Sequence, residues 1–63
     1  MKPGKYITMD GASLLVGHVL SFDSEKEFIE RYESELFQNL DAKARRAKLR
    51  LIYKLAKQAE QPE

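Results

Sequence analysis

The stretch that decides the fold class is KYITMDGASLLVGHVLSF, residues 5–22. Its first residues favour a strand, and Asp10-Gly11 is a strong signal for a two-residue hairpin turn because glycine tolerates positive φ. Such a turn places two pairs of side chains opposite each other, namely Ile7 with Leu14 and Tyr6 with Leu15. Side chains then alternate between two faces as far as Phe22. We therefore predict a β-hairpin over about residues 5–22.

A short helix from Ser13 is the alternative for the second half of this stretch. It would place four side chains on one side, namely Leu14, Leu15, His18 and Val19. Gly17 in the middle of such a helix would cost roughly 1 kcal/mol relative to alanine, so the hairpin is favoured. The helical alternative would turn the fold into an all-α arrangement of three helices.

Residues 24–38 predict an acidic amphipathic helix. Ser24 and Glu27 have the spacing of a capping box, in which side chains satisfy free backbone N–H groups. Apolar residues follow at helical spacing, namely Phe28, Ile29, Tyr32, Leu36 and Leu40. Residues 23–35 hold six acids against two bases. Asn39 suits a left-handed C-cap because asparagine tolerates that conformation.

A basic amphipathic helix is predicted over about residues 42–59, with Asp41 as its cap and 60–63 as a tail. The connection between the two helices is then only about three residues long, which suits a helical hairpin. The apolar arc of the second helix covers nearly half its circumference and holds Ala44, Leu49, Leu51, Ile52, Leu55, Ala56 and Ala59. Together these elements predict one small α+β domain, a β-hairpin packed on a two-helix hairpin.

The basic side of the second helix is the candidate partner-binding surface. Five cations share an arc of about 80°, and Tyr53 lies at the edge of the apolar arc beside them. The five, called the basic stripe below, are Lys43, Arg46, Arg50, Lys54 and Lys57. Like charges at this spacing destabilise an isolated helix by a few tenths of a kcal/mol per pair, so an anionic group is expected to face them. The candidates are the acids of residues 23–35, an acidic protein or second copy, and nucleic acid.

Length and composition favour self-association. A chain of 63 residues buries only about 60% of the surface that it exposes when unfolded. No cysteine is present to add a disulfide, and His18 is the sole histidine, so a Cys/His zinc site is excluded. We therefore expect a homodimer. No apolar run approaches the ~20 residues of a membrane span, and no signal-peptide pattern occurs, which favours a cytoplasmic location without membrane contact.

The residues that commonly carry catalysis are sparse. His18 has three serines and an aspartate near it in sequence, namely Ser13, Ser21, Ser24 and Asp23, but a catalytic triad is recognised by geometry rather than by proximity. We interpret His18 as a partly buried, hydrogen-bonded structural residue. Neither a calcium loop nor a phosphate-binding glycine loop occurs, so no cofactor, metal or small-molecule substrate is expected. The sequence predicts a non-catalytic protein-interaction module, a homodimeric adaptor or regulator. The alternative is a small nucleic-acid-binding protein that uses the basic stripe.

Overall fold

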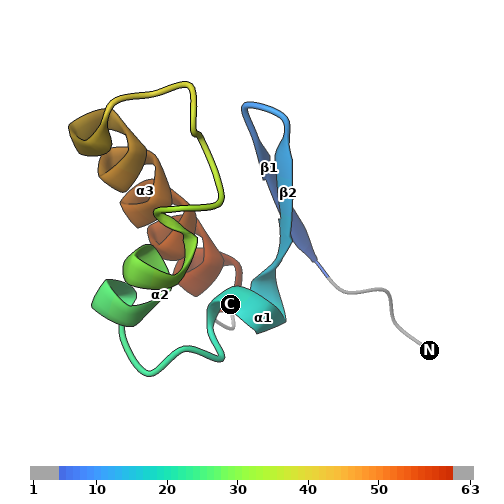
Figure 1. The fold of residues 1–63 in the computed structure, drawn as a ribbon. Helices are drawn as coiled ribbons and strands as arrows, with labels where there is room; N and C mark the ends of the chain where they lie inside the picture. The colour runs from blue at the N-terminus through green and yellow to red at the C-terminus, as the bar shows by residue number, and fades with distance from the viewer. Residues whose placement is uncertain (1–4, 61–63) are drawn as a thin grey trace.

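The computed structural model describes residues 5–60 and confirms the α+β fold, with an antiparallel two-stranded hairpin packed against helices (Figure 1). The elements in chain order are β1 (Tyr6–Met9), β2 (Ala12–Leu15), α1 (Val16–Val19), α2 (Glu25–Tyr32) and α3 (Ala42–Glu60). The long helix α3 contacts both α2 and β1 of the hairpin, and in Figure 1 it lies behind α2 with the hairpin to one side. The buried core therefore forms where these three elements meet.

The hairpin has the predicted register. Tyr6 pairs with Leu15 and Ile7 with Leu14. At the turn, φ is 50° at Asp10 and 87° at Gly11. Two successive positive φ values define the type I′ turn, whose twist matches that of the strands. Because side chains alternate along a strand, the face that holds Ile7 and Leu14 is buried, and Tyr6 and Leu15 lie on the opposite face.

The second strand ends at Leu15, so the prediction of strand as far as Phe22 is wrong beyond that residue. The Val16 N–H donates to the Lys5 carbonyl at 2.8 Å, and the Leu20 N–H then donates to the Val16 carbonyl at 3.0 Å. The single helical turn α1 begins at Val16, three residues after the start of the alternative helix. Its cause is burial, since a helical turn brings Val16 and Val19 to the same side, where both are buried. A continued strand would have put them on opposite faces.

Helix α2 begins as predicted and ends earlier. The Ser24 hydroxyl accepts a hydrogen bond from the Glu27 N–H at 3.2 Å, which confirms the cap. The last helical residue is Tyr32, so the predicted extent to residue 38 is wrong and the connection is longer than about three residues. The left-handed residue of this connection is the buried Phe37, with φ of 57°, and not Asn39.

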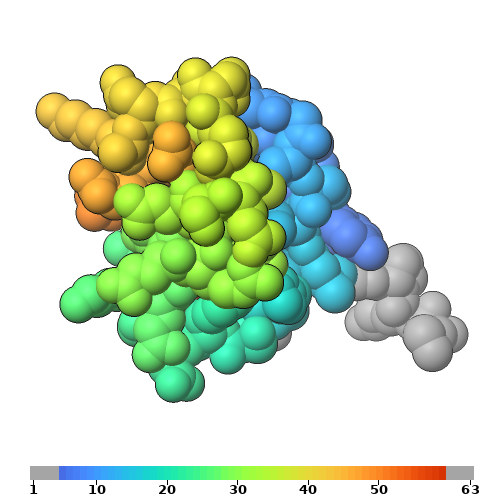
Figure 2. Space-filling view, in the orientation of Figure 1, coloured from blue at the N-terminus to red at the C-terminus, as the bar shows by residue number. Residues whose placement is uncertain are grey.

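Arg45 explains how the chain leaves α2 without losing its hydrogen bonds. The guanidinium donates to the carbonyl oxygens of Leu40 at 2.9 Å, Glu33 at 3.2 Å and Phe37 at 3.3 Å. Two of these carbonyls also have a donor within the connection, since Gln38 Nε2 donates to Glu33 at 3.1 Å and the Leu40 N–H to Phe37 at 3.0 Å. In a longer helix, backbone N–H groups would take the place of these donors. Space-filling atoms of this connection lie directly against the hairpin (Figure 2). The connection therefore covers the core instead of merely linking two helices.

Helix α3 is capped by Asp41, whose Oδ1 accepts from the Ala44 N–H at 2.8 Å, as predicted. It supplies four buried core residues, namely Leu49, Ile52, Tyr53 and Ala56. They pack against buried side chains of the other elements, namely Ile7, Leu14, Val16, Val19, Phe28, Ile29 and Phe37. Leu51, although it belongs to the predicted apolar arc, is 43% exposed. The predicted apolar arc of α3 is thus wider than the part of the helix surface that the other elements bury.

Two contacts hold β1 along α3. Lys48 Nζ lies 2.7 Å from Asp10 Oδ2 at one end of the strand, and Lys5 Nζ donates to the Ala59 carbonyl at 3.2 Å at the other. From Lys5 to Asp10 a strand extends about 17 Å, and from Lys48 to Ala59 a helix rises about 17 Å. The strand and the helix therefore run antiparallel over matching lengths.

Candidate interaction surfaces

The basic stripe lies on the surface, as predicted, and α2 covers part of it. Arg46 Nη1 lies 3.3 Å from Glu33 Oε2, and Arg50 Nε lies 3.5 Å from Glu25 Oε1. Both acids belong to the region that was expected to face the stripe from within the chain. The middle of the stripe therefore has an internal anionic partner.

These ion pairs are weak. All four side chains are substantially exposed, and exposed pairs contribute about 0–1 kcal/mol after screening and side-chain entropy. Their main effect is on the local field, because each carboxylate offsets one cation. Among the described side chains, Lys43, Lys54 and Lys57 form no ion pair with a carboxylate. Among the five cations of the stripe, these three lysines at its two ends therefore keep a charge that no direct ion pair with a described carboxylate offsets.

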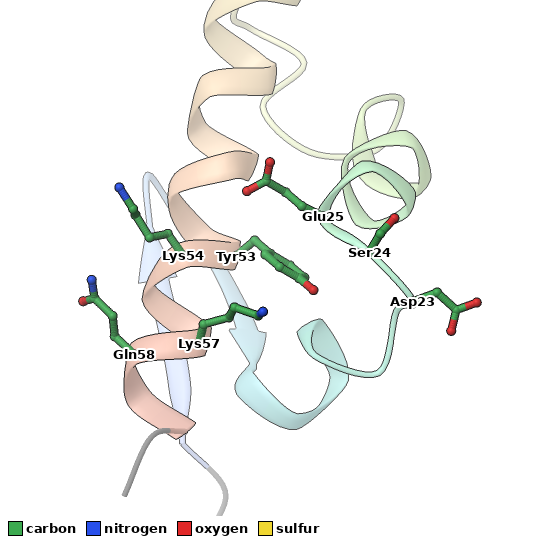
Figure 3. A pocket seen from close by; sticks show the side chains of 7 residues that line it. All are labelled: Asp23, Ser24, Glu25, Tyr53, Lys54, Lys57 and Gln58. Carbon is green, nitrogen blue, oxygen red and sulfur yellow. The ribbon is translucent and has the colours of Figure 1, made fainter. Parts of the chain in front are cut away.

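The C-terminal part of the stripe borders an open groove of about 560 Å³. Figure 3 shows the residues that line it, namely Asp23, Ser24, Glu25, Tyr53, Lys54, Lys57 and Gln58. Two lysines and two carboxylates line this groove, and one of the carboxylates, Glu25, also pairs with Arg50, so the groove keeps only a small positive charge. A groove with nearly balanced charge attracts a phosphate far less than a uniformly basic one.

Tyr53 is more buried than its predicted place beside the stripe suggested. It is 8% exposed and packs on Phe28 with ring centroids 5.8 Å apart. The Lys57 ammonium lies 5.8 Å from the centroid of the Tyr53 ring, within the range of a cation–π contact. Little of the ring is left to stack on a nucleic-acid base.

The free edge of β1 is a second surface. In an antiparallel ladder, hydrogen-bonded and non-hydrogen-bonded residue pairs alternate. The Val16 N–H donates to the Lys5 carbonyl, so Lys5 and Val16 form a hydrogen-bonded pair, and by alternation Ile7 and Leu14 form the next one. The backbone groups of Tyr6 and Thr8 therefore point away from β2. Within residues 5–60 the sheet has two strands only. The N–H and C=O groups of Tyr6 and Thr8 therefore form a strand edge that no other described residue pairs with.

Exposed apolar side chains lie next to this edge. The cross-strand pair of Tyr6 and Leu15 is 64% and 38% exposed on the outer face of the hairpin. Leu51 lies on α3 three residues after Lys48, which pairs with Asp10 at the end of β1, and four residues before Leu55, which packs against the core. The free edge is thus bordered by Tyr6 on the outer face and by Leu51 on the helix. We call the Tyr6 and Thr8 backbone with the side chains of Tyr6 and Leu51 the β1 edge surface.

His18 is hydrogen-bonded, as predicted, but it is exposed rather than partly buried. Its Nε2 lies 2.7 Å from the Tyr32 hydroxyl, and its ring packs edge-on against Phe22 at 5.5 Å. The Ser21 hydroxyl donates to the His18 carbonyl at 2.6 Å, and the Ser24 hydroxyl is used in the α2 cap. These contacts give His18 a structural role, in which it ties α1 to α2.

Comparison of the chain with protein-family models, with curated proteins and with solved structures returned no match. Within the described residues, no group of three or more potential metal-ligating side chains comes together. No helix in the described part of the chain is both long and apolar enough to cross a membrane. The interpretation of function therefore rests on the two surfaces described above.

Sequence patterns pointed to these surfaces unequally. The stripe was visible from helical spacing, whereas the pairing of Arg46 and Arg50 with α2 depends on how the helices cross. Exposure of Leu51 had one signal, an apolar arc broader than a single partner helix needs. For the three hydrogen bonds that Arg45 donates, the only signal in the sequence was that this cation falls among the apolar side chains of the arc.

Proposed function

We propose that this chain is a non-catalytic protein-interaction module that acts as a homodimer, in the role of an adaptor or regulator. The observation that carries the proposal is the exposure of Tyr6, Leu15 and Leu51 on a domain with a small core. Burying such side chains stabilises an association by about 25 cal/mol per Å² of apolar surface. A second copy would extend a core that one short chain can only partly build.

The basic stripe supports a further contact with an acidic protein partner. Lys43, Lys54 and Lys57 are exposed, and their long side chains can reach carboxylates on another molecule. To bind the same partner, Arg46 and Arg50 would have to leave Glu33 and Glu25 and pair with carboxylates of the other molecule. The cytoplasm suits this proposal, because a chain without cysteine needs no oxidising compartment.

Sedimentation over a wide range of protein concentration tests the proposal. The mass is expected to rise from 7.3 kDa towards twice that value as concentration increases. Leu51→Asp should shift the transition to higher concentration because a charge cannot be buried cheaply. Ser34→Asp adds the same charge at an exposed site after α2 and should leave dimerisation unchanged. A monomer at every concentration, or equal dimerisation by both variants, would contradict the proposal.

Nucleic-acid binding is the alternative function, and the three lysines that form no ion pair with a described carboxylate are the observation in its favour. Anisotropy of labelled duplex DNA and single-stranded RNA at ~50 and ~200 mM salt distinguishes the two, since phosphate contacts weaken steeply with salt. Under the main proposal neither probe binds. Micromolar, salt-sensitive binding that Lys54→Glu with Lys57→Glu abolishes would establish the alternative instead.

A further inference from the structure

We infer that the occupant of the β1 edge surface is a second copy of this chain, which pairs β1 with β1 across a two-fold axis. The inference rests on the proposed function, because it specifies how the homodimer forms. Two hairpins would then join into one four-stranded antiparallel sheet with β1 strands at its centre. This arrangement removes the exposed strand edge from solvent on both chains at once.

The hydrogen-bonding pattern of β1 is self-complementary. Tyr6 and Thr8 flank Ile7, and both direct an N–H and a C=O towards the free edge. With the two-fold axis at Ile7, Tyr6 of one copy lies opposite Thr8 of the other. Each such pair exchanges two hydrogen bonds. All the outward-directed groups of Tyr6 and Thr8 in both copies are thereby satisfied, which no other register achieves.

Charge and apolar contacts agree with this register. Lys5 lies at one end of β1 and Asp10 at the other. An antiparallel copy brings Lys5 near the oppositely charged Asp10 of the second chain, whereas a parallel copy would place like charges side by side. Because α3 runs along β1, the two-fold axis also brings the Leu51 side chains of both copies towards the added strand. Exposed apolar surface then becomes covered.

The free edge of β2 is a poorer candidate. It directs the backbone of Ser13 and Leu15 outwards. Leu15 is, however, the N-cap residue of α1, and the carbonyl of an N-cap residue accepts the first hydrogen bond of its helix. Fewer groups therefore remain for an added strand. Since β1 packs along α3, whereas β2 contacts the four-residue α1, the edge of β1 has the longer helix beside it to cover a partner.

Proline at Thr8 tests the inference, with proline at Ser13 as the matched control. Thr8 and Ser13 are cross-strand partners whose N–H groups face opposite free edges, and their hydroxyls share one hydrogen bond at 3.4 Å. Either substitution removes one outward N–H and that same side-chain contact, and both are tolerable at a sheet edge. Thr8→Pro should weaken the dimer roughly a hundredfold through two lost hydrogen bonds. Ser13→Pro should leave the dissociation constant unchanged.

A cysteine pair tests the register without altering the backbone, since the chain contains no cysteine of its own. In the inferred register, Tyr6 and Thr8 of different copies lie about 5.5 Å apart at Cα, within the reach of a disulfide. An oxidised mixture of Tyr6→Cys and Thr8→Cys chains should form covalent dimers. Either variant alone should not, because identical positions are offset by two residues. Disulfide formation tests the inference even if the Thr8→Pro variant does not fold, because it is measured on other variants.

The outcomes separate the inference from the proposed function. If Thr8→Pro leaves the dissociation constant of the dimer unchanged, or if Ser13→Pro weakens the dimer instead, the inference is overturned and the homodimer stays in place. A covalent dimer from Tyr6→Cys alone would overturn the register. A wild-type chain that stays monomeric would remove both the inference and the function on which it rests.

Discussion

Arg45 donates through Nε to the carbonyl oxygen of Phe37 at 3.3 Å, and Phe37 itself has φ of 57°. The left-handed region costs a residue other than glycine about 1–2 kcal/mol. Burial of the Phe37 ring and the contacts of the guanidinium with three carbonyls offset this cost. A residue of α3 thus stabilises the conformation of residues 33–41, together with the hydrogen bonds that Gln38 donates to Glu33 and Leu36.

Arg45→Met is expected to destabilise the fold by about 2–3 kcal/mol, because carbonyls that are partly buried lose charged donors. Arg45→Lys should recover only part of this loss, since an ammonium cannot reproduce the planar fork. Arg46→Met, at the neighbouring exposed site, should cost less than about 1 kcal/mol. Urea unfolding followed by circular dichroism measures all three. Equal losses at the two arginines would contradict this role for Arg45.

Alanine at the two glycines should have opposite effects. Gly11 has φ of 87° in the hairpin turn, so Gly11→Ala is expected to cost about 1–2 kcal/mol. Gly17 lies in α1, and a Cβ there would meet nothing within 4 Å. Gly17→Ala should therefore stabilise the fold by about 0.4–1 kcal/mol, chiefly by restricting the unfolded chain. Thermal unfolding tests the pair, and a loss of stability in Gly17→Ala would be inconsistent with a helical α1.

Aspartate at two adjacent residues of α3 should separate folding from association. Ile52 is fully buried, so Ile52→Asp is expected to unfold the chain, given a stability of only about 5 kcal/mol for small domains. Leu51→Asp should keep the circular dichroism spectrum of the wild type, because Leu51 already contacts solvent. Unfolding by both variants would mean that Leu51 is essential to the core of the single chain.

Charge reversal at the paired arginines should leave the fold intact. Arg46→Glu with Arg50→Glu replaces two exposed attractions by repulsion from Glu33 and Glu25. We expect a loss of about 1–2 kcal/mol in dilute buffer, smaller in concentrated salt because exposed charges are screened. Melting temperatures in ~20 mM and ~500 mM salt measure this difference. An unfolded double variant at both salt concentrations would show that the stripe contributes to the core.

Sequence patterns predicted the hairpin turn and register well, because both depend on residues adjacent in the chain. Asp10-Gly11 specifies the turn, and a two-residue turn leaves one possible pairing of Ile7. The end of β2 could not be predicted in the same way. It depends on where β1 begins and on the joint burial of Val16 and Val19, which only the tertiary structure provides.

The same reasoning applies to the helices and the stripe. The caps at Ser24 and Asp41 were predictable because a cap is a local hydrogen bond. The end of α2 was not, since it depends on Arg45, which lies well beyond it in the chain. Exposure of the five cations followed from helical spacing, whereas the carboxylates that meet Arg46 and Arg50 come from a helix whose crossing the pattern does not specify.

The contacts of Arg45 have a consequence for the order of folding. The carbonyls of Glu33, Phe37 and Leu40 gain the Arg45 guanidinium as a donor only when the first turns of α3 have formed and docked. Residues 33–41 and the beginning of α3 should therefore gain and lose structure as one cooperative unit. Native-state hydrogen exchange would then show a shared opening free energy for three amides. These are the Leu36 amide, which donates to the Tyr32 carbonyl at the end of α2, the Leu40 amide, which donates to the Phe37 carbonyl, and the Arg45 amide of α3.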